Sequence, residues 1–112
     1  MKKENRLIIG LEETVILEGG KKYKVKIDTG ADSSSIDESL MQNFKDKEIL
    51  ASKIIRYALG RHRRPTVMIN IEFQGKQFYE KFTISNRKNL KFKILIGKDI
   101  LKKEGFLIDP NK

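Results

Sequence analysis

Residues 66–73, with the sequence TVMINIEF, have the period-two pattern of a β-strand that buries one face. Four apolar side chains would share that face: Val67, Ile69, Ile71 and Phe73. A turn centred on Gly75 follows, and QFYEKFTIS reads as the returning strand. A long antiparallel hairpin of this kind restricts the chain to a fold built around a β-sheet.

Further short strands are predicted on both sides of this hairpin. KYKVKID alternates in the same way, with Tyr23, Val25 and Ile27 on one face. Five more segments indicate short strands: RLIIG, ETVILEGG, KIIRYA, KFKILIG and FLID. We interpret DSSS as a loop and LGRHRRP as a turn, because glycine, serine and charged residues interrupt the apolar pattern there.

Two short helical segments complete the prediction. Asp37 is placed to cap a short helix that carries Leu40, Met41 and Phe44. KDILKKEG fits one to two helical turns, with Gly105 as the C-cap. The sequence therefore predicts an all-β protein, a small closed β-barrel with one short C-terminal helix, in a single domain covering residues 1–112.

Composition excludes several kinds of site. The chain has 112 residues, no cysteine and one histidine, which rules out disulfides and thiol nucleophiles and leaves too few ligands for a zinc site. His62 lies within GRHRR, a poor setting for a catalytic base. We expect no metal and no cofactor. No membrane span or signal peptide is evident, so we expect a cytoplasmic protein.

The net charge of +9 predicts attraction to polyanions, either nucleic acid or an acidic peptide, unless the lysines form only a solvated surface. Nucleic acid is the weaker candidate. Tyr57 is the only aromatic residue near the most basic segment, and no platform for stacking bases is apparent.

Two separated motifs carry the candidate chemistry. VKIDTGAD ends a predicted strand with Asp28, Thr29 and Gly30, and FKILIGKDIL leads through Gly97 and Lys98 into the predicted helix. Asp-Thr-Gly alone is also an ordinary surface turn. Together the two motifs resemble those of retropepsin-like aspartic proteases.

This resemblance implies roles for residues in both motifs. Asp28, Thr29 and Gly30 would be catalytic, and Ala31 and Asp32 would contact substrate. Asp32 would also form an ion pair with Lys98, the residue after Gly97. This ion pair would tie the catalytic loop to the helix. The chain has only one Asp-Thr-Gly. The second carboxylate of an aspartic protease would then be Asp28 of another copy, so a homodimer is expected.

The same resemblance assigns residues 53–69 to a β-hairpin flap that closes over substrate. Gly60 would lie near its tip. Arg56 and His62 make the segment basic, together with three arginines that we predict to bind substrate with Gly60: Arg61, Arg63 and Arg64. An arginine-rich flap favours a substrate rich in glutamate or aspartate, because arginine binds carboxylates bidentately.

A closer resemblance extends from Gly10 to Pro110. IGLEETVIL, KIDTGADSSSID, FTISNRKNLKFKILIGKDIL and FLIDP are similar to the retropepsin-like family associated with RimK-type glutamate ligases, formerly called ATP-dependent zinc proteases. The family implies a dimeric peptidase that acts on glutamate-rich tails, with a functional link to the ligase and to a ribosomal protein. Arg87 matches a family motif, and the sequence gives it no role beyond that of a turn residue.

Two alternatives to an aspartic endopeptidase stay open at this stage. One is a catalytically silent module of the same fold that binds an acidic protein tail or a ribosomal partner. The other is a small basic β-barrel that binds nucleic acid.

Overall fold

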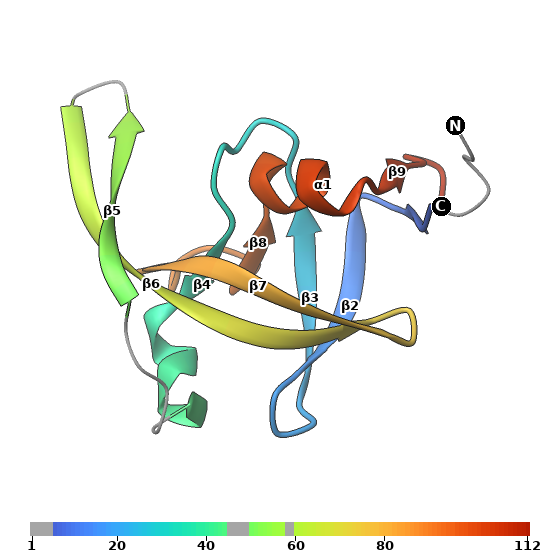
Figure 1. Cartoon of the computed structure of the whole chain (residues 1–112), viewed down its shortest axis with the longest axis horizontal. Coiled ribbons are helices and arrows are strands. Elements are labelled where there is room, and N and C mark those ends of the chain that lie inside the picture. Colours follow the sequence, from blue (N-terminus) through green and yellow to red (C-terminus); the bar gives the residue numbers. More distant parts are fainter. Residues whose placement is uncertain (1–5, 45–49, 58–59) are drawn as a thin grey trace.

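The computed structural model describes residues 6–44, 50–57 and 60–112, and the side chains of residues 6–42 and 64–112. Most of the described chain is β-structure, with a single short α-helix near its C-terminal end (Figure 1). The elements are β1 Ile8–Ile9, β2 Glu12–Leu17, β3 Lys22–Ile27, β4 Ser35–Asp37, the 3₁₀ helix η2 Glu38–Phe44, β5 Leu50–Tyr57, β6 Gly60–Phe73, β7 Lys76–Ser85, β8 Ile94–Ile96, α1 Lys98–Glu104 and β9 Leu107–Ile108.

Six strands close into a barrel in the order β2-β3-β8-β4-β7-β6, and β6 pairs back onto β2. The β6–β7 hairpin is its longest ladder, and it turns at Gln74 and Gly75, whose φ angles are both positive (51° and 79°). Positive φ at both central residues suits a tight hairpin turn, because its twist matches that of the strands. The predicted closed barrel and its central hairpin are confirmed.

The predicted apolar faces form the barrel core. Val67, Ile69, Ile71 and Phe73 are each at most 2% exposed, and Val25 and Ile27 are buried with them. Strand alternation puts these side chains inside because each strand of a closed barrel turns one face to the interior. Phe73, Phe78 and Phe106 meet edge to face at centroid distances of 5.5–6.5 Å. These contacts join the β6–β7 hairpin to the segment before β9.

Both predicted helical segments are present. Asp37 accepts a hydrogen bond from the Ser39 amide at 3.1 Å and so caps η2, which is a 3₁₀ helix. The helix α1 ends at Gly105 in the left-handed conformation, with the Gly105 amide bonded to the Leu101 carbonyl, as predicted. No helix in the described residues is long and apolar enough to cross a membrane.

Two predicted boundaries were wrong. Ser35–Asp37 forms β4, although Ser35 was expected in a loop and no strand was predicted here; the segment fits between β7 and β8 and completes the barrel. Residues 60–65 were predicted as part of a turn, but their backbone belongs to β6, paired with β5. Glycine and a run of charged residues suggest a turn locally, but the antiparallel pairing of residues 60–64 with β5 makes them part of the hairpin strand.

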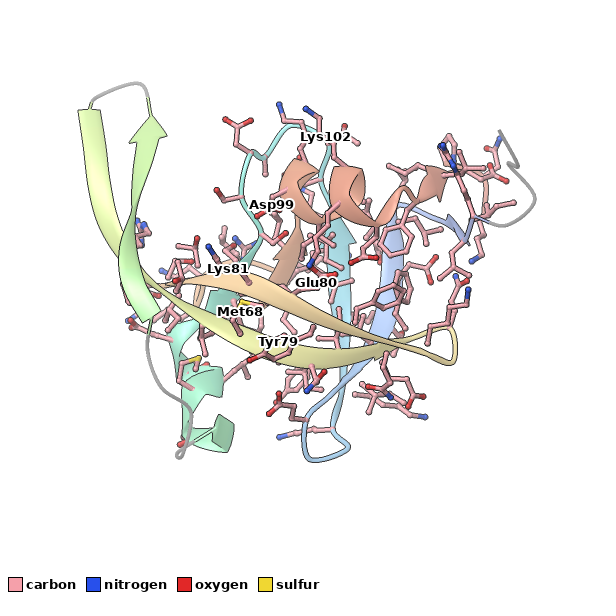
Figure 2. All side chains as sticks on the ribbon, viewed as in Figure 1. Met68, Tyr79, Glu80, Lys81, Asp99 and Lys102 are labelled. Atoms are coloured by element: carbon pink, nitrogen blue, oxygen red, sulfur yellow. The ribbon has the colours of Figure 1, made fainter. Side chains whose placement is uncertain are left out.

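Glu80 is a charged residue inside this core. It lies on β7, on the side that faces α1; Figure 2 labels Glu80 on β7 and Asp99 on α1. Its side chain is 1% exposed; Oε1 accepts a hydrogen bond from Lys103 Nζ at 3.0 Å, and Oε2 has no partner among the described residues. Burial, together with the neighbouring carboxyl group of Glu104, raises the pKa of Glu80 to about 7, and Lys103 opposes that rise.

The raised pKa of Glu80 predicts a stability that falls with pH. The unfolded carboxyl loses its proton near 4.5, whereas the folded one keeps it until about 7. The free energy of unfolding should therefore fall by about 3 kcal/mol between these pH values and then level off. Denaturant unfolding at a series of pH values measures this, and Glu80→Gln should remove that slope. An unchanged slope in the variant would assign the pH dependence to other groups.

Candidate active site

The Asp-Thr-Gly segment begins where β3 ends beside β8. These two strands are parallel, with Val25 opposite Ile94 and Ile27 opposite Ile96. The ladder continues by one bond, because the Asp28 amide donates to the Ile96 carbonyl at 2.9 Å. Both strands therefore deliver their motifs to the same end of the barrel, β3 into Asp28 and β8 into Gly97 (Figure 1). The two motifs far apart in the sequence are neighbours in space.

The loop after β3 is folded around the Asp28 carboxylate. The Gly30 amide donates to Asp28 Oδ1 at 2.9 Å, and the Ala31 amide donates to the Asp28 carbonyl at 3.2 Å. A Cβ at Gly30 would come within 3.3 Å of Asp28 Oδ1, so a larger residue would crowd the carboxylate. Asp28 is partly exposed, and Thr29 and Gly30 are exposed. The local geometry fixes the direction of Asp28 and leaves the loop accessible.

Asp99 and Ser34 fasten this loop to the start of α1. Asp99 accepts hydrogen bonds from the Ser34 amide (3.1 Å), the Ser34 hydroxyl (2.7 Å) and the Ile100 amide (2.8 Å). The Ser34 Oγ in turn accepts from the Gly97 amide at 2.9 Å, and Ser34 is fully buried. Sequence reasoning passed over both residues. An aspartate in the first turn of a helix was the available signal, but its partner lies 65 positions away.

Two further contacts link the loop to α1. The Lys98 amide donates to the Ala31 carbonyl at 2.8 Å, and Lys98 Nζ lies 2.9 Å from Asp32 Oδ1. The predicted Asp32–Lys98 ion pair is thus confirmed. Its side chains are 89% and 43% exposed, so the pair contributes less than about 1 kcal/mol to stability. Its effect is to orient the loop more than to hold the fold together.

Arg87 is more than a turn residue. Its Nε donates to the Phe92 carbonyl at 2.9 Å, and Nη1 donates to Ser35 Oγ at 3.3 Å. Its backbone amide donates to the Asp37 carboxylate. Burial lowers the pKa of Arg87, while the negative charges of Asp37 and, less strongly, Asp28 raise it. The charges of both carboxylates therefore act on the guanidinium, that of Asp37 more strongly.

The Asp37 carboxylate has a structural role, because it accepts hydrogen bonds from Ser39 and from the Arg87 amide. Although burial raises its pKa, hydrogen bonds from Ser39 and from the Arg87 amide hold the pKa of Asp37 below its ordinary value. Asp37 is 1% exposed. It therefore stays ionised as a fixed anchor for the segment after β7.

The predicted flap corresponds to the β5–β6 hairpin, which projects beyond the barrel (Figure 1). Its backbone ladder places Arg56 opposite Arg61 and Tyr57 opposite Gly60, so Gly60 belongs to the last pair of the ladder, near the tip as predicted. Residues 58–59 and the side chains of Arg61 and Arg63 lie outside the described part of the chain. Arg64 is described, and it lines a pocket together with Ser33, Ser35 and Arg87.

Comparison with solved structures identifies the fold. A Legionella pneumophila protein of unknown function (DUF785) matches with a TM-score of 0.67 and 21% identity over 95% of this chain and 94% of its own. The EIAV protease complexed with an inhibitor matches at 0.65 and 19%, again over 95% and 94%. The retroviral protease-like domain of Ddi1 from Leishmania major matches at 0.56 and 16%, over 84% and 74%. The chain therefore has the retropepsin-like fold.

No protein-family model and no curated protein sequence matches the chain. The likeness to solved structures establishes the architecture, and function has to be argued from the site itself.

Proposed function

We propose that this chain is an aspartic peptidase that works as a homodimer, with Asp28 of each copy forming the catalytic pair. The observation that carries the proposal is the Asp28 loop itself. It combines an oriented and accessible carboxylate with a rigid attachment to β8 and α1. The fold, shared with the EIAV protease, supports the same reading.

A second copy is needed because the carboxylates near Asp28 within one chain already have other roles. Asp32 is paired with Lys98, Asp37 binds Ser39 and the Arg87 amide, and Asp99 binds Ser34. Asp28 accepts only a bond from within its own loop among the hydrogen bonds of the described residues. A twofold dimer would place two such loops face to face across its axis. Thr29 would then hydrogen-bond across the axis and hold the loops in register.

The proposed reaction is direct hydrolysis of a peptide bond. Two adjacent carboxylates cannot both ionise, so the pair of Asp28 side chains shares one proton. The ionised carboxylate removes a proton from water, and the water oxygen attacks the peptide carbonyl carbon. The protonated carboxyl donates its proton to the carbonyl oxygen. The carboxyl that took the proton from water then gives it to the peptide nitrogen as the C–N bond breaks. The other carboxylate takes a proton from a hydroxyl of the tetrahedral intermediate, so an amine and a carboxylic acid leave and the pair again shares one proton.

We propose acidic, glutamate-rich peptides as the substrate class. The net charge of +9 supports this, as do the basic residues that the sequence places in the β5–β6 hairpin. The resemblance to the family associated with RimK-type ligases supports the same class, with the tail of a ribosomal protein as one candidate substrate.

A cleavage assay read by mass spectrometry tests the proposal. Wild type and Asp28→Asn are incubated with a mixed peptide library that includes glutamate-rich C-terminal tails, from acidic to neutral pH. We expect products from wild type alone, with acidic residues enriched around the cleavage sites. Products from both proteins would contradict the aspartic mechanism. Binding of acidic peptides without cleavage by wild type would indicate a binding module on the same fold.

A further inference from the structure

A pocket of about 290 Å³ lies beside the Asp28 loop. Its walls come from four parts of the chain that meet at one end of the barrel: the loop after β3, β4, β6 and the end of β7 with the segment after it. The ladder sets Ser35 opposite Thr83 and Thr66 opposite Thr83, which brings these strands together. The polar lining consists mainly of hydroxyl and guanidinium groups: Ser33, Ser35, Arg64, Thr83, Ser85 and Arg87.

The pocket is positively charged, and the part of the chain that the structure describes gives it no direct counter-ion. Within the described residues, neither Arg64 nor Arg87 forms a salt bridge. The two side-chain hydrogen bonds of Arg87 go to neutral acceptors, a carbonyl and a hydroxyl. Asp37, the nearest anion by its effect on Arg87, is occupied by Ser39 and the Arg87 amide. A half-buried guanidinium in this position is suited to bind a carboxylate, because arginine is always charged and offers donors in a planar fork.

The pocket is also close to the proposed chemistry. Ser33 and Ser35 belong to the segment that begins at Asp28, and the Asp28 charge acts on Arg87. A volume of about 290 Å³ is at the small end of the roughly 300–1,000 Å³ of pockets for small molecules. It suits one side chain of a bound peptide better than a larger ligand.

We infer that this pocket is a specificity subsite that receives a glutamate or aspartate side chain of the substrate, with Arg64 and Arg87 as the groups that bind its carboxylate. The inference rests on the proposed peptidase function and deepens it. It assigns acidic specificity to a built pocket of the barrel, in addition to the β5–β6 hairpin. Arg64 connects the two, because it lies on β6, the strand that continues into the hairpin.

Peptide binding to the Asp28→Asn protein tests the subsite without turnover. The probes are a blocked hexaglutamate and a blocked hexaglutamine, measured by calorimetry at fixed salt. We expect Arg64→Gln and Arg87→Gln, each added to Asp28→Asn, to weaken hexaglutamate binding by about tenfold or more. Hexaglutamine binding should change little. Lys88→Gln is the matched control. It removes one positive charge, as Arg64→Gln does, but Lys88 is exposed and lies outside the pocket lining.

Equal losses in Lys88→Gln and Arg64→Gln would overturn the subsite, because they would show attraction to net charge alone. Arg87→Gln also removes bonds to Phe92 and Ser35, so Arg64→Gln decides the test if Arg87→Gln misfolds. The two proposals separate cleanly. Cleavage by wild type without an Arg64-dependent preference for glutamate overturns the subsite alone. Arg64-dependent binding of hexaglutamate without cleavage by wild type overturns the peptidase function alone.

Discussion

Replacing Gly97 with alanine is expected to lower the free energy of unfolding by about 3 kcal/mol and to abolish any activity of the Asp28 loop. A Cβ at Gly97 would lie 2.7 Å from the Ala31 carbonyl oxygen and 3.0 Å from the Ser33 carbonyl carbon and oxygen. All three are backbone atoms of the loop that carries Asp28. They cannot rotate away as a flexible side chain would, so either the loop or the start of α1 has to shift.

The matched control is Gly19→Ala. Gly19 has a φ of +94° and no atom within 4 Å of the added Cβ, so that change carries only the cost of the backbone conformation, about 1 kcal/mol. Denaturant unfolding of both variants beside wild type gives the two costs. Similar costs would mean that β8 and the loop do not approach as closely as described. A much larger cost at Gly97 would confirm that the loop is packed directly on the turn between β8 and α1.

Most of the fold could be predicted from local patterns in the sequence. Alternation of apolar and polar residues predicted the strand that buries Val67, Ile69, Ile71 and Phe73. Gly105 predicted the end of α1. A one-residue shift in the register of a strand would turn its apolar face outward, so alternation strongly constrains a barrel. The parallel pairing of β3 with β8 was not predicted, because no local pattern specifies a partner so distant in the chain.

The supports of the site were harder to predict than its motifs. Asp28, Thr29 and Gly30 are contiguous, so a motif finds them. Ser34 and Asp99 act through one hydrogen-bonded pair between segments far apart in the sequence, and either residue alone is an ordinary turn or helix-start residue. Glu80 had a usable signal. Alternation in QFYEKFTIS places it on the same face as Phe78 and Phe82, which packs into the core.

Arg87 shows what a folded chain adds to a motif. In the sequence it stands in a polar loop, SNRKN, where a turn residue is the natural interpretation. In the structure, β4 and β7 run parallel and bring Ser35 and Asp37 beside it. Its role depends on the pairing of β4 with β7, and β4 was not predicted as a strand. The error in β4 and the missing role for Arg87 therefore have the same physical origin.

The second large effect on activity is expected from Asp28→Asn. A dimer in which both subunits carry Asp28→Asn has no carboxylate to take a proton from water, so it should lose about a thousandfold or more in rate. If the catalytic pair is built from two copies, one altered subunit should inactivate the whole dimer. A site complete within one chain would leave the unaltered subunit active.

Mixing the two proteins distinguishes these arrangements. Wild type and Asp28→Asn are combined at increasing ratios of variant to wild type and allowed to exchange subunits. The cleavage rate is then measured and divided by the total dimer concentration. With equal amounts, random pairing leaves about one quarter of the dimers with two Asp28 side chains, so the rate per dimer should fall to about one quarter of the wild-type value. Independent subunits would give about one half. Lys88→Gln, mixed in the same way, should leave the rate per dimer unchanged, since Lys88 lies outside the Asp28 loop and the pocket. The quadratic decline would require a shared pair of carboxylates, and it does not depend on knowing the natural substrate.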